Sequence, residues 1–224
     1  MQPEPVFIEE KRLVKTLLSR KPSSNAFIVA ALTVLFMTLM TFFYWNAPAA
    51  WGALLPAIKL EIFQHGQLWR IFSAIFVHAD IEHLLSNMYM LFIFSFFVYG
   101  YFGGGVYPAL SLVVAGLVNA VAISTYAADA ELIGASGLVY ILGGFWLTLY
   151  VFIQRQYSVL NRLMRVTGIA FVIFLPSTFV PTTSYRTHAI GFAAGVIMGI
   201  IYFRRNKIVI RANEIYKTNY VEAI

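Results

Sequence analysis

The stretch Gly134-Ala135-Ser136-Gly137, which opens an apolar run lasting to residue 154, decides how this chain can fold. About 20 apolar residues are what an α-helix needs to cross a bilayer. A polar side chain at the mouth of such a helix is costly unless it has a partner or a role. The stretch therefore predicts a membrane-spanning helix with a hydroxyl placed for chemistry near its first turn.

The composition of the whole chain agrees with a membrane environment. Of 224 residues, 60% are hydrophobic and 12% are charged, and the mean hydropathy is +0.75. Soluble domains carry about 25% charged residues. The chain has no cysteine, which excludes disulfides, thiolate nucleophiles and cysteine-ligated metals. The net charge of +6 does not call for nucleic acid, because basic residues concentrate in the cytoplasmic loops of membrane proteins.

Six apolar runs predict an all-α polytopic membrane protein with six transmembrane helices. The runs are 26–45, 82–101, 106–126, 135–154, 160–180 and 187–203. The fifth is weakened by Arg162, Arg165 and Pro176. The first is too long for the apolar part of a signal peptide, which is about 7–15 residues.

Basic residues predict the orientation of this bundle. Thirteen of the sixteen lysines and arginines fall in segments on the N-terminal side of the membrane, so both termini are expected in the cytoplasm. The expected division is a cytoplasmic segment 1–25, a six-helix domain 26–204 and a basic cytoplasmic tail 205–224. The long outer loop 46–81 is rich in apolar residues. It is expected to be an interfacial or partly re-entrant hairpin, with Trp51 and Trp69 near the headgroups.

Ser136 is the candidate nucleophile. Its backbone N–H is one of the unpaired donors at a helix start, where a negative charge is favoured. Gly134 and Gly137 permit a tight turn and a close backbone approach. A small-residue packing patch would also explain this motif.

His188 is the candidate base. Gly191 and Gly195 follow it at i+3 and i+7, so the three share one helix face that a neighbouring helix can approach closely. Tyr140 lies on the expected facing stripe of the fourth span. A Ser–His pair at one depth is a nucleophile and its base. A lone intramembrane histidine could also be a proton relay or a packed polar group.

His83 and Asn87, four residues apart on the second span, form a third cluster at the same outer depth. Such a pair can donate hydrogen bonds to an oxyanion, or it can join helices. His78 is expected to brace the long loop. Its spacing of five from His83 does not fit the i, i+4 pattern of a zinc-binding helix, so neither a metal nor a cofactor is expected.

Together these motifs resemble those of the rhomboid family of intramembrane serine proteases, over about residues 26–204. Five matches carry the resemblance. They are Trp69-Arg70 in the first loop, His78, His83 and Asn87 at the second helix, the Gly134-x-Ser136-Gly137 motif, Tyr140, and His188 with Gly191 and Gly195 on the sixth helix.

The resemblance implies both a fold and a mechanism. Six helices would surround a water-filled cavity, with the fourth helix central. Ser136 and His188 would form a catalytic dyad, with Tyr140 packed against the imidazole. The Ser136 N–H, His83 and Asn87 would bind the oxyanion, and Trp69 and Arg70 would anchor the first loop among the headgroups.

The expected partners are transmembrane protein substrates and the lipid bilayer, in the plasma membrane. Two alternatives stay open. One is an inactive rhomboid-like protein that binds membrane helices, and the other is a small transporter that uses His83 or His188 as a proton relay. The transporter predicts carboxylates buried within the spans, and the sequence has none deep in any span.

Overall fold

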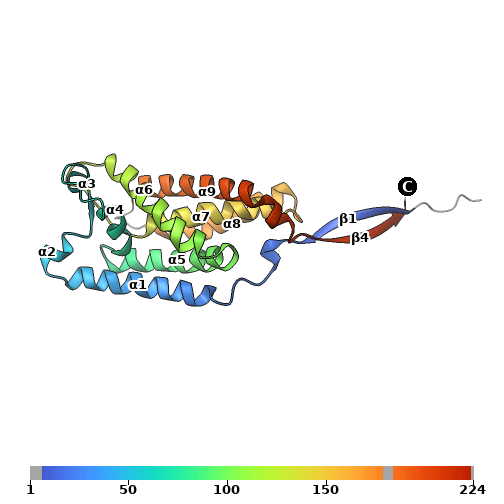
Figure 1. Cartoon of the computed structure of the whole chain (residues 1–224), viewed down its shortest axis with the longest axis horizontal. Helices are drawn as coiled ribbons and strands as arrows, with labels where there is room; N and C mark the ends of the chain where they lie inside the picture. Colours follow the sequence, from blue (N-terminus) through green and yellow to red (C-terminus); the bar gives the residue numbers. More distant parts are fainter. Residues whose placement is uncertain (1–6, 179–183, 223–224) are drawn as a thin grey trace, which may run out of the picture.

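Helices make up the body of the protein (Figure 1). The structure, a computed structural model, describes residues 7–178 and 184–222. The long helices are α1 (Ala26–Asn46), α5 (Ile81–Phe102), α6 (Ser111–Ser124), α7 (Ser136–Ile153), α8 (Val159–Thr178) and α9 (Tyr185–Arg211). Five helices are long and apolar enough to cross a membrane, α6 being counted with the turn before it, η3 (Gly105–Leu110).

The helix α8 takes the place of the predicted fifth span. It has 20 residues, and Arg162 and Arg165 lie in its first two turns. Residues 179–180, the end of that predicted span, lie outside the described part of the chain. The all-α, multi-pass membrane class is confirmed.

The helix α7 lies at the centre of the bundle and α1 at its edge. Within the protein 72% of α7 is buried, against 22% of α1. The most extensive contact of α7 is with α9, because glycines on both helices let the backbones touch. A Cβ at Gly195 would overlap the carbonyl oxygen of Ile141, and one at Gly144 would overlap that of Phe192. Such small-residue contacts hold helices together in lipid, where apolar burial alone drives little association.

The long connection between α1 and α5 is folded. It contains α2 (Ala49–Gly52), β2 (Ala57–Ile58), α3 (Lys59–Phe63), α4 (Arg70–Ser73) and the single turn η2 (Ala74–Phe76). The strand β2 pairs antiparallel with β3 (Glu131–Leu132), which links this connection to the segment before Ser136. Trp51 and Trp69 are 63% and 52% exposed, and their position near the headgroups stays a prediction.

The two ends of the chain pair with each other. The strands β1 (Phe7–Lys15) and β4 (Ile215–Glu222) run antiparallel, with Lys11 opposite Thr218, and this ribbon projects from the bundle along its long axis (Figure 1). The helix α9 reaches Arg211, whereas the sequence predicted its end near residue 203. We call this end of the bundle the ribbon end and the opposite end, which holds α2 to α4, the loop end. Which of them faces the cytoplasm stays a prediction.

Polar contacts fasten the ribbon to the bundle. Arg20 Nη1 donates to Asn213 Oδ1 at 2.6 Å, and Arg155 pairs with Glu214 at 3.0 Å. An isolated two-stranded ribbon is marginally stable in water. These contacts therefore help to hold the two strands together.

Candidate active site

The turn before α7 is held on both sides by hydrogen bonds. Gly134 has φ +115°, a left-handed conformation that favours glycine. Its N–H donates to the carbonyl of Ala74 at 2.8 Å, and the Ala135 N–H donates to His78 Nε2 at 3.2 Å. Ser136 then begins α7, and its side chain is buried. No side chain of the described residues caps this helix start, so its first N–H groups are left for a ligand.

His188 lies in the first turn of α9, pressed against α7. Its ring stacks on Tyr140, with centroids 4.0 Å apart and planes 15° apart. A Cβ at Gly191 would stand 2.8 Å from the Gly137 carbonyl oxygen, so α9 contacts α7 one residue after Ser136. Ser136 and His188 are both described, and no hydrogen bond joins the Ser136 hydroxyl to the imidazole. Catalytic pairs are often loose before substrate binds.

His83 and Asn87 lie on α5 beside the same turn. The His83 ring is packed on Gly134, where a Cβ would stand 2.7 Å from Nε2. Asn87 Nδ2 donates to the His83 carbonyl at 2.9 Å and keeps a second N–H. Asn87 Oδ1 and His83 Nδ1 are buried without a partner in the described chain. Buried polar atoms are nearly always satisfied, so this spot is suited to water or a ligand.

His78 was expected to brace the long loop, and its side chain also joins α1 to the turn before α7. Its Nε2 accepts from Ala135 on one side, and its Nδ1 donates to Thr41 Oγ1 on α1 at 3.0 Å on the other. Its carbonyl accepts from Trp45 Nε1 at 2.8 Å. Burial, with the nearby His83 ring, lowers the pKa of His78 to about 3. The ring is therefore neutral at physiological pH, as an acceptor at Nε2 must be.

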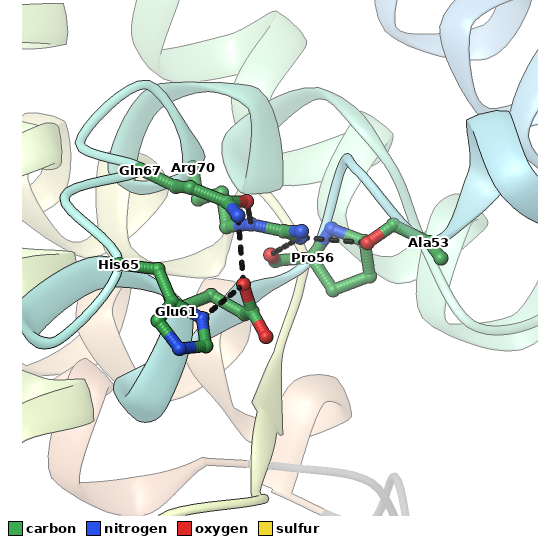
Figure 2. A network of polar contacts seen from close by, with 6 residues as sticks. All are labelled: Ala53, Pro56, Glu61, His65, Gln67 and Arg70. Atoms are coloured by element: carbon green, nitrogen blue, oxygen red, sulfur yellow. Dashed lines mark hydrogen bonds and ion pairs between the residues drawn. The ribbon is translucent and has the colours of Figure 1, made fainter.

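The expected headgroup contact of Arg70 is wrong. Its guanidinium is buried within the loop, with Nη1 donating to the carbonyls of Ala53 at 2.6 Å and Pro56 at 3.0 Å. Its Nε donates to Gln67 Oε1 at 2.7 Å (Figure 2). Gln67 in turn donates to Glu61, which also pairs with His65 at 3.0 Å. Arg70 therefore organises the loop, because its guanidinium joins two backbone carbonyls and the Gln67 side chain.

Asn119 is a site neighbour that the sequence analysis missed. It is buried on α6, and its Nδ2 donates to the Ile71 carbonyl of α4 at 3.0 Å. Its Oδ1 lies 3.5 Å from the position of a Cβ on Gly137. Asn119 thus ties the loop to the helix that carries Ser136. A single asparagine within an apolar span was the available signal.

The site contains histidines but no buried acid. Among the described residues, no group of three or more His, Cys, Asp or Glu could hold a metal ion. The buried polar residues of this part include no Asp or Glu. A proton-coupled transporter would need such a carboxylate, so the described spans do not favour that alternative.

Comparison with known proteins agrees with this arrangement. The family model described as "Rhomboid domain" matches residues 65–205, more than half of the chain. The chain is 26% identical to RHOMBOID-like protein 5 of Arabidopsis thaliana over 153 residues, 67% of this chain and 49% of that protein. It is 25% identical to "Putative rhomboid protease YdcA" of Bacillus subtilis (strain 168) over 155 residues, 64% of this chain and 71% of that protein.

RHOMBOID-like protein 1 of Arabidopsis thaliana is 25% identical over 150 residues, which are 66% of this chain and 38% of that protein. The chain thus matches about half or less of the length of the two plant relatives. The matched region, from the middle of the outer loop to the end of the sixth span, holds every motif residue quoted above. The chain belongs to the rhomboid family.

Proposed function

We propose that this protein is a serine endopeptidase that cuts transmembrane segments of other proteins within the membrane. The observation that carries the proposal is the stacking of the His188 ring on Tyr140, next to an uncapped helix start occupied by Ser136. Membership of the rhomboid family supports a protease. A buried imidazole packed against the helix that begins with Ser136 can supply the chemistry.

The proposed reaction proceeds through an acyl-enzyme. Ser136 Oγ attacks the scissile carbonyl carbon while His188 takes the hydroxyl proton. The tetrahedral intermediate collapses, the C–N bond breaks, and His188 returns the proton to the leaving amine. Water, deprotonated by His188, then attacks the acyl carbon. The C–Oγ bond breaks as His188 returns the proton to Ser136 Oγ, and a carboxylic acid is released.

Three groups are suited to stabilise the oxyanion. The Ser136 N–H points from the uncapped helix start, and the His83 ring lies on Gly134 beside it. Asn87 has an N–H to spare, as described above. Losing one such donor typically costs about 100–1,000-fold in rate.

The dyad needs no third member in this proposal. The sequence has no Asp or Glu between Glu131 and Glu214, the interval that contains both Ser136 and His188. The Tyr140 ring and the contact of Gly191 with α7 fix the imidazole instead. This combination positions the ring without a buried charge, which a bilayer would penalise.

Substrates would be helices cut near the loop end of the bundle, where the site lies. Residues that weaken a helix, such as Gly or Pro, should favour cleavage, because a scissile carbonyl must leave its helical hydrogen bond. We also propose that the ribbon end faces the cytoplasm, that the protein resides in the plasma membrane, and that residues 26–204 form the protease domain between two terminal segments, 1–25 and 205–224.

Labelling with a fluorophosphonate probe tests the proposal. The wild-type protein, reconstituted in lipid, should be labelled and should cleave a transmembrane substrate. Ser136→Ala should lose both signals, and His188→Ala should lose cleavage. Ser95→Ala is the matched control, because Ser95 is a buried serine of α5 that lies twelve residues beyond His83 and hydrogen-bonds to the Phe92 carbonyl and to the Tyr107 side chain, away from Ser136. If the wild-type protein is neither labelled nor active, the chain is the inactive helix-binding alternative.

A further inference from the structure

An apolar groove opens between α5, α7 and α8 in the half of the bundle next to the ribbon. It consists of two hollows, of about 390 Å³ and about 570 Å³, that share Tyr150, Ile169 and Ile173. The first hollow is further lined by Ile93, Phe97 and Trp146. A groove of this size on the lipid-facing side of a bundle has room for an acyl chain.

A single basic side chain stands at the mouth of this groove. The Arg165 guanidinium is exposed and lies over the Tyr157 ring, 3.9 Å from its centroid. Its Nη1 donates to the Tyr150 hydroxyl at 3.5 Å. A guanidinium has five N–H donors, so most of them stay available. Tyr150 and Tyr157 hold the Arg165 guanidinium in place at the groove.

The Arg165 guanidinium has no carboxylate partner among the residues that the structure describes. In the described part of the chain it takes part in no ion pair. The sequence has no Asp or Glu from residue 132 to residue 213, so neither α7 nor α8 can supply one. One turn earlier, Arg162 Nη1 donates to the Val151 carbonyl, and its Nε is buried without a partner in the described residues. Among the described residues, no carboxylate neutralises this corner, which suits it to an anion from outside the chain.

The charged and apolar groups of the groove lie at the depths expected for the headgroup and the acyl chain of a phospholipid. Arg165 lies near the start of α8, at the ribbon end, where headgroups are expected. Ile173 lies eight residues further along the same helix, or about 12 Å deeper into the bilayer at 1.5 Å per residue. The charged group at the mouth of the groove would meet the lipid headgroup, and the apolar side chains beneath it would meet the acyl chain.

We infer that this groove binds an anionic phospholipid from the leaflet at the ribbon end. Its phosphate would take the free donors of Arg165, and one acyl chain would lie against Trp146, Ile169 and Ile173. Because bilayer hydrocarbon is as apolar as the groove, the chain gains little by entering, and selection comes from the headgroup. Basic pockets between helices on the cytoplasmic side commonly bind anionic headgroups. The inference does not depend on peptidase activity.

Native mass spectrometry tests this site. The full-length protein is reconstituted in vesicles of phosphatidylcholine and phosphatidylglycerol in equal amounts, released gently, and weighed with its retained lipid. The wild-type protein should retain one phosphatidylglycerol in preference to phosphatidylcholine. Arg165→Gln should reduce that preference at least about fivefold, as expected for one arginine at an anionic surface.

Three further variants separate the groove from general surface charge. Arg205→Gln removes an equal charge from an exposed residue of α9 near the same end and should keep the preference. Gly168 lines the groove, and a Cβ there meets nothing within 4 Å. Gly168→Ala should therefore retain lipid, whereas Gly168→Leu should fill the groove and lose it. Equal retention by the wild type, Arg165→Gln and Gly168→Leu, or no preference for phosphatidylglycerol in the wild type, would overturn the inference.

Discussion

Gly191→Ala should slow cleavage about tenfold without preventing membrane insertion. A Cβ at Gly191 stands 2.8 Å from the Gly137 carbonyl oxygen, and ordinary contacts begin at 3.4 Å. The neighbour is backbone and cannot rotate away, so α9 must retreat from α7 by about 0.6 Å, the difference between these distances. His188 lies three residues earlier on the same helix face and moves with it. Because about 1 Å of misplacement can cost about 100-fold in rate, a shift of this size costs about tenfold.

The valine variant extends the same reasoning. Gly191→Val adds two methyl groups near Tyr140, whose Cβ is 3.4 Å from the added Cβ, so a loss of about 100-fold or more is expected. Initial rates of substrate cleavage in proteoliposomes measure the effect. Gly105→Ala is the control, because a Cβ there meets nothing within 4 Å and its φ is not left-handed. Full activity of Gly191→Val, or an equal loss in Gly105→Ala, would refute positioning by close packing.

Three other outcomes are expected. His78 is neutral when folded, with a pKa of about 3 against an ordinary 6.5, so the stability that it contributes is complete above pH 6.5 and is lost as the pH falls toward 3. As the pH is lowered across that window, the temperature of thermal inactivation should fall less steeply in His78→Gln than in the wild type. An equal slope in the two proteins would count against a neutral His78 that braces the fold. Arg70→Lys keeps the positive charge but loses the branched guanidinium. It should lower the free energy of unfolding by about 1–3 kcal/mol, because a buried carbonyl loses its donor. A denaturant titration that shows no change would contradict this. Lys11→Cys with Thr218→Cys should form an intramolecular disulfide on oxidation, since the two residues are directly opposed, whereas Lys11→Cys with Ile215→Cys should not.

The helices could be predicted from sequence because apolar length is itself the requirement for crossing a bilayer. The predicted run 82–101 differs from α5 by one residue at each end. The stripe of Gly191 and Gly195 also indicated which face of α9 meets α7, since a fixed helical period places both on one side. These predictions depend only on local sequence and on the geometry of one helix.

The role of Arg70 could not be predicted from local sequence. An arginine next to a tryptophan in an outer loop predicts a contact with lipid headgroups. Its actual partners, the carbonyls of Ala53 and Pro56, become available only after the loop has turned back on itself. Backbone acceptors leave no trace in the sequence, so this error follows from the tertiary path of the loop.

The terminal ribbon was missed for a related reason. Residues 7–15 and 215–222 lie at opposite ends of the chain and pair only because the six long helices bring the chain back to the end of the bundle where it began. A strand of eight or nine residues is only weakly indicated by its own sequence, and local sequence does not show which distant segment it pairs with. The extension of α9 to Arg211, which delivers β4 to β1, likewise depends on contacts such as Arg20 with Asn213.

The distribution of satisfied and unsatisfied polar atoms separates structural from functional groups. His78 and Asn119 have their side-chain partners within the fold, and substituting them should chiefly disturb position and stability. His83 Nδ1 and Asn87 Oδ1, equally buried, have none in the described chain. A bilayer makes such atoms costly, so their persistence beside an uncapped helix start is best explained by water or substrate completing their bonds during the reaction. By the same reasoning, the unpartnered Arg162 Nε near Arg165 marks the opposite end of the bundle as the second place where an outside molecule is needed.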